Sequence, residues 1–403
     1  MKMRRAFPSI WFALYLNGMF LFIYFGKGIF SGFLTIGVVT LCGLSTLVYA
    51  RTSICKTLKN KCVLYVVLFA IYLSLSLIWT SASTYGAFKV RGFWLGAVIP
   101  FISLLILLDK NPLILKKIEK ISLIFGLLAS IILIVSSGGS FGNRNSIEGM
   151  NSIWNARDIG IGSIVCYYYF FTKKNNYNIK LIGLPVMLVL LAGMLFNASR
   201  GPIAALSSAI LFLELSSFTK IKNQYFKGLK FTYLMLLSII ILVTAFSTSS
   251  RLNISYMIDD KNVQDRVKLY SSSFEIVTTK PIFGTGIGGF SVAYKGNDAR
   301  IYTHNFLLEI LIELGIVGLL FTLVIFRFFI RDRKLLLSND SGVVWTAFFI
   351  FFLVNAMFSG DLFGNAIMWL PGAGMIKVKE SLIMKKEEMK KNRNLNLRQY
   401  TER

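Results

Sequence analysis

The feature that most constrains this chain is a series of long apolar segments separated by short charged ones. Most of them hold about 15–25 residues, close to the length that an α-helix needs to cross a bilayer. We place twelve such spans at 9–26, 28–50, 62–79, 93–108, 121–136, 159–171, 181–197, 202–218, 231–247, 305–326, 342–358 and 361–376. Since backbone polar groups cannot stay unpaired in lipid, these spans fold as helices. With 55% hydrophobic residues and a mean hydropathy of +0.63, the sequence predicts an all-α polytopic membrane protein with about twelve transmembrane helices.

The net charge of +25 is distributed unevenly between the two sides of the membrane. If the N-terminus is cytoplasmic, 31 of the 44 Lys and Arg residues fall in inner segments and 13 in outer ones. This distribution follows the positive-inside rule and predicts that both termini are cytoplasmic. The basic surplus is therefore a topology signal, and we expect no nucleic acid as a partner. The basic tail at 377–403 is expected either to lie along anionic lipid or to be disordered.

Two further patterns concern targeting and cysteine chemistry. The N-terminal MKMRRAFPSIWFALYLNG resembles a signal peptide, but no small-residue cleavage site follows it, and a second apolar run comes almost at once. We interpret it as a retained first helix. Cys42, Cys55, Cys62 and Cys166 lack CxxC spacing, and none lies in a segment expected outside the cell. We therefore expect neither a disulfide nor a metal site.

Three outer loops are long: 80–92, 137–158 and 248–304. The last of them contains NVQDRVKLYSSSFEIVTT, whose apolar residues follow helical spacing. We predict an amphipathic helix there that ends at Lys280-Pro281, because proline cannot continue it. The Gly-rich turn IFGTGIGGF follows, with G-x-G-x-x-G spacing at Gly284, Gly286 and Gly289. As a nucleotide motif it fails because no strand precedes it, so we expect the glycines to let the loop turn tightly over the helices.

Basic residues on the outer side work against the topology rule, so each requires a reason. Five of the thirteen are arginines near helix ends or in ordered-looking segments: Arg91, Arg157, Arg200, Arg266 and Arg300. Arg200 stands where a helix begins at SRGP, and the free N–H groups of a helix start favour an anion. A guanidinium adds bidentate recognition of phosphate oxygens. The alternative is an arginine that snorkels to the interface, but several arginines together favour an anionic site.

His304 is the sole histidine and stands where the long outer loop becomes an apolar helix. A neutral imidazole at this place can accept a proton from a hydroxyl at near-neutral pH. Nearby arginines would lower its pKa and keep it neutral, as a base requires. An interfacial histidine or a helix cap is the alternative. Together with a diphosphate held by arginines, the histidine suits transfer of a diphosphate-activated group to an alcohol.

The acidic residues near this helix divide into two groups. Glu309 and Glu313 share one face of the expected span and point away from His304, so we expect them to join helices by hydrogen bonds, protonated or paired. Weaker candidates for orienting His304 lie at the outer ends of helices: Asp158, Asp265 and Asp361. Asp265, Asn305 and Arg300 are the candidate supporting residues of the site.

Four segments resemble the O-antigen ligase and polymerase superfamily of bacterial envelope glycosyltransferases. They are SRGP at 199–202, the DR at 265–266, PIFGTGIGGF at 281–290 and THNFLLEILIELGIVGLL at 303–320, in the family's order. The match covers about 197–327, while the first 190 residues match only in hydropathy and topology. The combination is specific although each motif alone is not.

The resemblance implies a GT-C-like membrane enzyme with a polyprenyl-diphosphate-linked glycan as donor. Family members transfer this glycan to a sugar hydroxyl at the outer face of the cytoplasmic membrane, with inversion and without metal, nucleotide or other cofactor. The matching positions are Arg200 and Arg266 for the diphosphate and His304 as base. Arg91 and Arg157 join the diphosphate site by placement alone, without a motif. Membrane lipids, a flippase and a chain-length regulator are the further partners that this function implies.

The resemblance also divides the chain. Residues 1–196 hold helices one to seven, 197–327 form the ligase-related region with the loop 248–304, 328–376 hold the last two spans, and 377–403 form the tail. The acceptor is a lipid-linked repeat unit in polymerases and a lipid-anchored core in ligases. We favour the polymerase, because no core-binding feature is visible.

Two other classes of protein remain as alternatives. A flippase or transporter of lipid-linked glycans usually has two related halves, but the long loop occurs once here. A cell-wall glycan polymerase of the elongation type has a similar helical layout, and a loop carboxylate such as Asp265 would then carry its chemistry.

Overall fold

The computed structural model describes residues 7–17, 31–50, 53–138, 145–147, 151–173, 177–217 and 261–401. Within these residues the chain consists of helices and turns, without a strand. Five helical segments are long and apolar enough to cross a membrane: Lys61–Ile78, Ser83–Lys110, Ile114–Ser136, Phe306–Ile330 and Asp340–Phe358. The all-helical membrane architecture is therefore confirmed, whereas the number of twelve spans stays a prediction. The expected span 231–247 and the start of the long loop lie outside the described residues.

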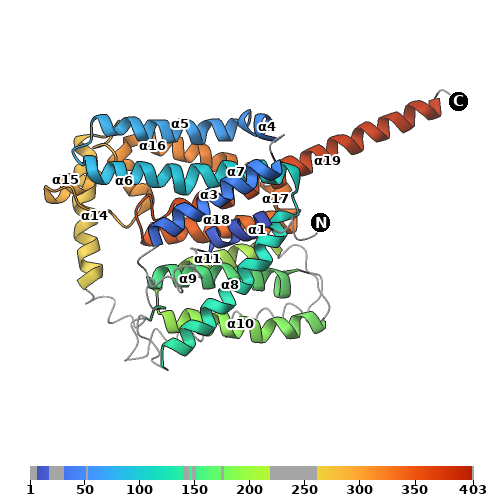
Figure 1. Ribbon diagram of the computed structural model, residues 1–403, viewed down its shortest axis with the longest axis horizontal. Helices are drawn as coiled ribbons and strands as arrows, with labels where there is room; N and C mark the ends of the chain where they lie inside the picture. The colour runs from blue at the N-terminus through green and yellow to red at the C-terminus, as the bar shows by residue number, and fades with distance from the viewer. Residues whose placement is uncertain are drawn as a thin grey trace.

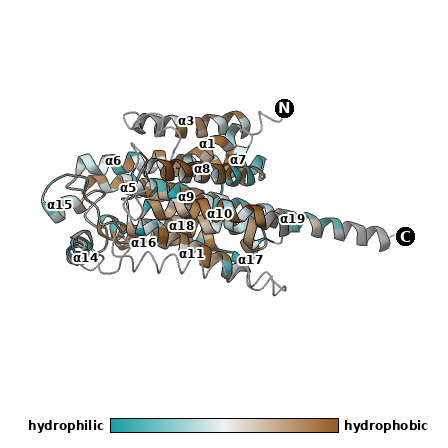
Figure 2. Cartoon of the chain, turned by 90° about the horizontal axis from the view of Figure 1, so that it is seen from below, coloured by the Kyte–Doolittle hydropathy of each residue, from teal (hydrophilic) through white to brown (hydrophobic). Residues whose placement is uncertain are grey.

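Several of the other expected spans coincide with shorter or less apolar helices. The bundle comprises α1 (Phe7–Leu16), α3 (Ser31–Ala50), α5 (Lys61–Leu75), α6 (Ser83–Phe93), α7 (Ile99–Lys110), α8 (Ile114–Ser136), α9 (Ser152–Cys166), α10 (Tyr177–Asn197), α11 (Arg200–Ser217), α16 (Phe306–Ile330), α18 (Asp340–Phe358) and α19 (Trp369–Thr401). The short helices α4 (Ile54–Leu58) and α17 (Arg333–Leu337) connect neighbours at one end of it. Hydrophobic residues dominate the bundle in Figure 2.

The outer loop expected at 80–92 is wrong. Residues from Ser83 onward are helical, and α6 runs through a π-helical turn at Trp94–Val98 into α7 as one long segment. The loop prediction relied on the polar residues of this stretch, in particular Lys89 and Arg91. Lys89 is fully buried against carboxylates of α16, so its charge is compatible with a helix inside the protein.

The last expected span, 361–376, is also displaced. Residues 361–365 form a turn, a 3₁₀ turn follows at Ala366–Met368, and α19 begins at Trp369. Pro371 lies in the first turn of α19, where a missing N–H costs nothing. The helix continues to Thr401, so the described part of the tail is helical rather than disordered. It projects from the end of the bundle opposite α14 and α15 (Figure 1).

The amphipathic helix predicted in the long loop is confirmed. It is α14 (Lys261–Thr279), and it ends directly before Lys280-Pro281. Most bundle helices run side by side, but α14 lies across one end of the bundle, and Figure 2 shows it nearly end-on (Figures 1 and 2). The short helix α15 (Phe290–Lys295) follows at the same end. The two helices and their connecting turns therefore cover that end.

The helix α16 is broken at Gly315, whose φ of 66° and ψ of −167° are not helical. The turn at 281–286 pairs with the backbone groups that the break releases. Thr285 N–H donates to Ile312 O (2.8 Å), and Gly286 N–H donates to Glu313 O (2.9 Å). Beyond the break, Ile316 N–H donates to Pro281 O (2.9 Å). Non-helical backbone inside a membrane helix is thus tolerated because protein groups satisfy it.

We expect Gly315→Ala to destabilise the protein by about 2 kcal/mol or more. The backbone at Gly315 is left-handed, and an added Cβ would lie 2.1 Å from Ile282 O. The measurement is the thermal midpoint of the purified protein in detergent. Gly43→Ala in α3 is the control, since an added Cβ there meets nothing within 4 Å and alanine favours a helix. Equal midpoints for the two variants would contradict this account of the break.

Candidate functional site

The loop at 359–365, between α18 and α19, is the place where several helices meet. Tyr85 of α6 donates to Asp361 (2.8 Å), and Arg157 of α9 donates to Gly364 O (3.0 Å) and to Asn365 Oδ1 (2.7 Å). Leu362 N–H donates to Glu309 of α16 (3.2 Å). The loop therefore joins parts of the chain that are up to about 280 residues apart, as the Tyr85–Asp361 contact shows.

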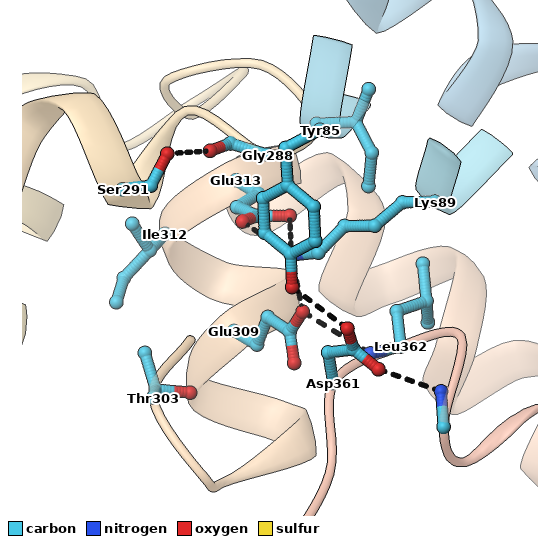
Figure 3. Close-up of polar contacts among 12 residues, drawn as sticks. Tyr85, Lys89, Gly288, Ser291, Thr303, Glu309, Ile312, Glu313, Asp361 and Leu362 are labelled. Carbon is cyan, nitrogen blue, oxygen red and sulfur yellow. Dashed lines mark hydrogen bonds and ion pairs between the residues drawn. The ribbon is translucent and has the colours of Figure 1, made fainter. Parts of the chain in front are cut away.

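A buried charge cluster lies directly beneath this loop. Lys89 of α6 is completely buried and donates to Glu309 and to both oxygens of Glu313 (2.7 and 2.9 Å). Its ammonium also lies 4.6 Å from the ring centroid of Tyr85. Figure 3 shows Tyr85 and Lys89 pointing from α6 toward Glu309, Glu313 and Asp361. The expectation that the two glutamates are paired and join helices is thus confirmed, and their partner is Lys89.

Asp361 connects the buried cluster to the surface. Its side chain is fully buried, accepts from Gly364 N–H (2.7 Å), and forms an ion pair with Arg300 Nε at 3.3 Å. Burial alone would raise the pKa of this carboxyl, but the charges of Lys89 and Arg300 outweigh it and lower the pKa below its usual value. Arg300, about half-exposed, therefore stands at the surface with one side of its guanidinium held by a permanent anion.

His304 lies immediately before α16 with a left-handed backbone (φ 58°), which is unusual for a residue with a side chain. Asn305 begins the helix as its N-cap and accepts from Leu308 N–H at 3.1 Å. The imidazole lies against the ring of Tyr302, with centroids 4.5 Å apart. Its Nδ1 is buried and has no hydrogen-bond partner among the described residues. The imidazole is therefore held against Tyr302 while its Nδ1 makes no hydrogen bond to the described residues.

The electrostatic surroundings keep His304 neutral. Burial and the nearby Arg266 guanidinium lower its pKa to about 4, although Asp361 opposes them. Arg266 also acts on Tyr302, as do Asp361 and Arg300; burial and Asp361 raise the pKa of the Tyr302 hydroxyl. Three charged groups from three separate segments, Arg266, Arg300 and Asp361, thus lie within electrostatic range of the histidine–tyrosine pair.

The candidate arginines differ in environment. Arg266 is half-buried on α14, with the exposed Asp265 beside it. Arg91 is exposed, and its guanidinium lies 5.9 Å from the Phe88 ring, which Arg300 approaches at 5.7 Å from the same end of the bundle. These two arginines therefore share one aromatic neighbour.

Arg157 and Arg200 are placed differently. Arg157 is only 4% exposed, and its two terminal nitrogens bind the 359–365 loop. Arg200 is the first residue of α11, as expected, and is partly exposed. The preceding Ala198 has a left-handed backbone (φ 48°), and the following Gly201 packs against Phe358 at the end of α18. The SRGP segment thus lies beside Phe358, the residue directly before the 359–365 loop.

Three residues of this site were not predicted from sequence: Tyr85, Lys89 and Tyr302. Lys89 carried the clearest signal, because a lysine flanked by apolar residues needs a carboxylate partner, and Glu309 and Glu313 needed a cation. Tyr302 carried none beyond its closeness to His304. Within the described ranges, no three His, Cys, Asp or Glu side chains are grouped so that they could hold a metal ion.

Comparison with known families places this geometry in context. Residues 185–323 match the family model described as O-Antigen ligase. The matched region includes most of α10, all of α11, α14 and α15, and α16 through residue 323. Comparison with curated proteins finds no match.

We expect Lys89→Met to cost about 3–5 kcal/mol, because it leaves two carboxylates buried without a cation. Its measure is the yield and thermal midpoint of folded protein. Adding Glu309→Gln and Glu313→Gln to Lys89→Met should restore much of the loss by removing the stranded charges. Lys56→Met is the control: Lys56 is 61% exposed, and its partner Asp109 keeps Lys377 at 2.8 Å. A Lys89→Met protein as stable as the control would contradict the cluster's role.

Proposed function

We propose that this chain, whose residues 185–323 match the family described as O-Antigen ligase, is a membrane glycosyltransferase that polymerises a lipid-linked glycan at the outer face of the bacterial cytoplasmic membrane. The donor is a polyprenyl-diphosphate-linked oligosaccharide, and the acceptor is a sugar hydroxyl of a second lipid-linked repeat unit. The observation that carries the proposal is the sole histidine, held neutral beside Arg266 within the matched region.

His304 acts as the general base in the proposed reaction. The acceptor hydroxyl attacks the anomeric carbon of the donor, so a new C–O bond forms as the bond to the diphosphate oxygen breaks, with inversion. The hydroxyl proton passes to the imidazole, and the bonding pair leaves with the polyprenyl diphosphate. The reaction needs no metal in this scheme, because arginines stabilise the charge that develops on the diphosphate.

Arg266 and Arg200 are the proposed primary diphosphate ligands. Arg266 is near enough to His304 to affect its pKa, and Arg200 begins α11, where the helix N-terminus adds to the attraction for an anion. Arg91 and Arg300 border the same end of the bundle through Phe88. Arg157 is supported more weakly as a ligand, since two of its nitrogens are already bound; its proposed part is to hold the 359–365 loop in place.

A ligase that transfers the glycan to a lipid-anchored core is the second candidate, since the matching family is described as O-Antigen ligase. Both reactions use the same donor and base and differ in the acceptor. Supplying a lipid-linked repeat unit as the only glycan therefore separates them, because only a polymerase can use it on both sides.

The first experiment incubates purified protein with that single substrate, as wild type and as His304→Ala. We expect a ladder of products from the wild type and a loss of at least about a hundredfold in rate for the variant, the lower range for removing a general base. Asp265→Ala is the matched comparison, since Asp265 is exposed on α14. A ladder that survives in His304→Ala and disappears in Asp265→Ala would transfer the role of base to the aspartate. Product formed only when a lipid-core acceptor is added would identify a ligase.

The pH profile gives a separate prediction. A base must be neutral, so activity should fall as the pH drops through the pKa of His304, which burial and Arg266 lower to about 4. Arg266→Gln removes a positive neighbour and should move this acidic limb to higher pH, whatever it does to the maximal rate. Lys268→Gln, on the exposed surface of the same helix, should leave the limb in place. The measurement is kcat/KM against pH; an unmoved limb in Arg266→Gln would separate this arginine from the base.

A further inference from the structure

An apolar groove of about 680 Å³ lies at the C-terminal end of α5, and its lining does not include His304. One wall is formed by Tyr72, Leu75 and Trp79 of the α5 segment, and the other by the turn 280–284 with Ile282 and Phe283. Leu75, Ile282 and Phe283 are more than one-third exposed, so the groove opens outward. From Tyr72 to Trp79 it follows α5 for about 10 Å.

The walls of this groove are fixed by hydrogen bonds. The turn is held to the broken part of α16 by the backbone bonds of Thr285 and Gly286, and Tyr72 donates its hydroxyl to Leu314 O at 2.7 Å. Tyr72 therefore presents only its ring to the groove. Trp79 packs between Tyr72 and Phe283, with centroids 6.2 and 6.4 Å away. A preformed apolar surface of this kind suits a hydrocarbon chain better than a surface that must order on binding.

Lys280 is the charged residue of the lining, at the point where α14 ends. An occupant with an apolar chain and an anionic head would place its head at this ammonium. Lys280 directly follows α14 and lies fourteen positions after Arg266, so the backbones of the two residues are about 20 Å apart. A donor whose diphosphate lay at Lys280 would therefore hold its reactive anomeric carbon far from Arg266, the arginine that acts on the pKa of His304.

An acceptor substrate, unlike a donor, can bind with its diphosphate at Lys280 and still react at a distant site. Its reacting hydroxyl lies on a sugar remote from its own diphosphate, so an oligosaccharide of a few sugars can span the distance from Lys280 to His304. We propose that the groove holds the polyprenyl anchor of the acceptor, with Lys280 bound to the anchor's diphosphate. This inference rests on the proposed function. It adds a second lipid site, separate from the arginines that hold the donor.

The test uses two lipid-linked substrates, one that can act only as the acceptor and one that can act only as the donor. The acceptor is the repeat unit joined to polyprenyl diphosphate through a methylene in place of the anomeric oxygen, which can accept but cannot donate. The donor is the lipid-linked unit with its accepting hydroxyl replaced by hydrogen. The same repeat unit as a free oligosaccharide serves as an acceptor without an anchor, and the product of one transfer is quantified.

Leu75→Trp fills the groove, and Leu64→Trp is the control. Leu64 lies eleven residues earlier on the same face of α5, three turns away, and the two leucines are 52% and 50% exposed. For Leu75→Trp we expect the KM of the anchored acceptor to rise about tenfold toward that of the free oligosaccharide, since buried methylenes of the anchor lose their contacts. The KM values of the donor and of the free oligosaccharide should stay unchanged, and Leu64→Trp should match the wild type.

Lys280→Gln, at the rim, is the second variant and should raise the same KM by a few fold without disturbing the packing. A rise in the donor KM instead would assign the groove to the donor and overturn the inference. Unchanged KM values in both variants would mean that the groove binds only bulk bilayer lipid, and this result would also overturn the inference. A wild type that makes no product from these substrates would reject the proposed function together with this inference, whereas an active wild type with unaffected variants rejects the inference alone.

Discussion

The break in α16 determines much of what surrounds it. A membrane helix that interrupts its hydrogen bonding must find other partners for the released groups, and the turn at 281–286 supplies them. Fixing this turn also fixes what precedes and follows it in the chain, namely α14 on one side and α15 with the His304 segment on the other. The position of the proposed base therefore follows from a backbone constraint well inside the membrane helix.

The site is assembled from more of the chain than the matched region contains. Residues 185–323 carry His304, Arg266, Arg200 and the two glutamates, but Lys89 and Asp361 lie on either side of that range. Lys89 compensates the glutamates, and Asp361 holds both Tyr85 and Arg300. The first and last parts of the chain thus supply charges without which the central part could not be buried.

The sequence was sufficient for the features that periodicity and charge encode. The helical class, the amphipathic α14 and its end before Lys280-Pro281 follow from spacing and from proline. Loop 80–92 was wrong because hydropathy treats a lysine as a mark of the surface, whereas Lys89 is buried with its counter-ions. Such pairing is a tertiary property that no window of local sequence contains. For the same reason, the sequence did not predict that Asp361 joins Tyr85 and Arg300. It also did not predict the left-handed backbone of His304.

The glycines of the turn have a consequence for reading mutational data. Gly284, Gly286 and Gly288 all have positive φ, and a Cβ on them would lie within 2.7 Å of Glu313, Thr80 and Gly86, respectively. Each glycine thus lies where the turn packs closely against another segment of the chain, namely α16, Thr80 or α6. A screen that scores product alone would rank these positions with His304, and the G-x-G-x-x-G spacing would then invite a nucleotide-binding explanation. Scoring protein abundance beside product separates the two kinds of loss, because we expect the glycine variants to reduce the amount of folded protein.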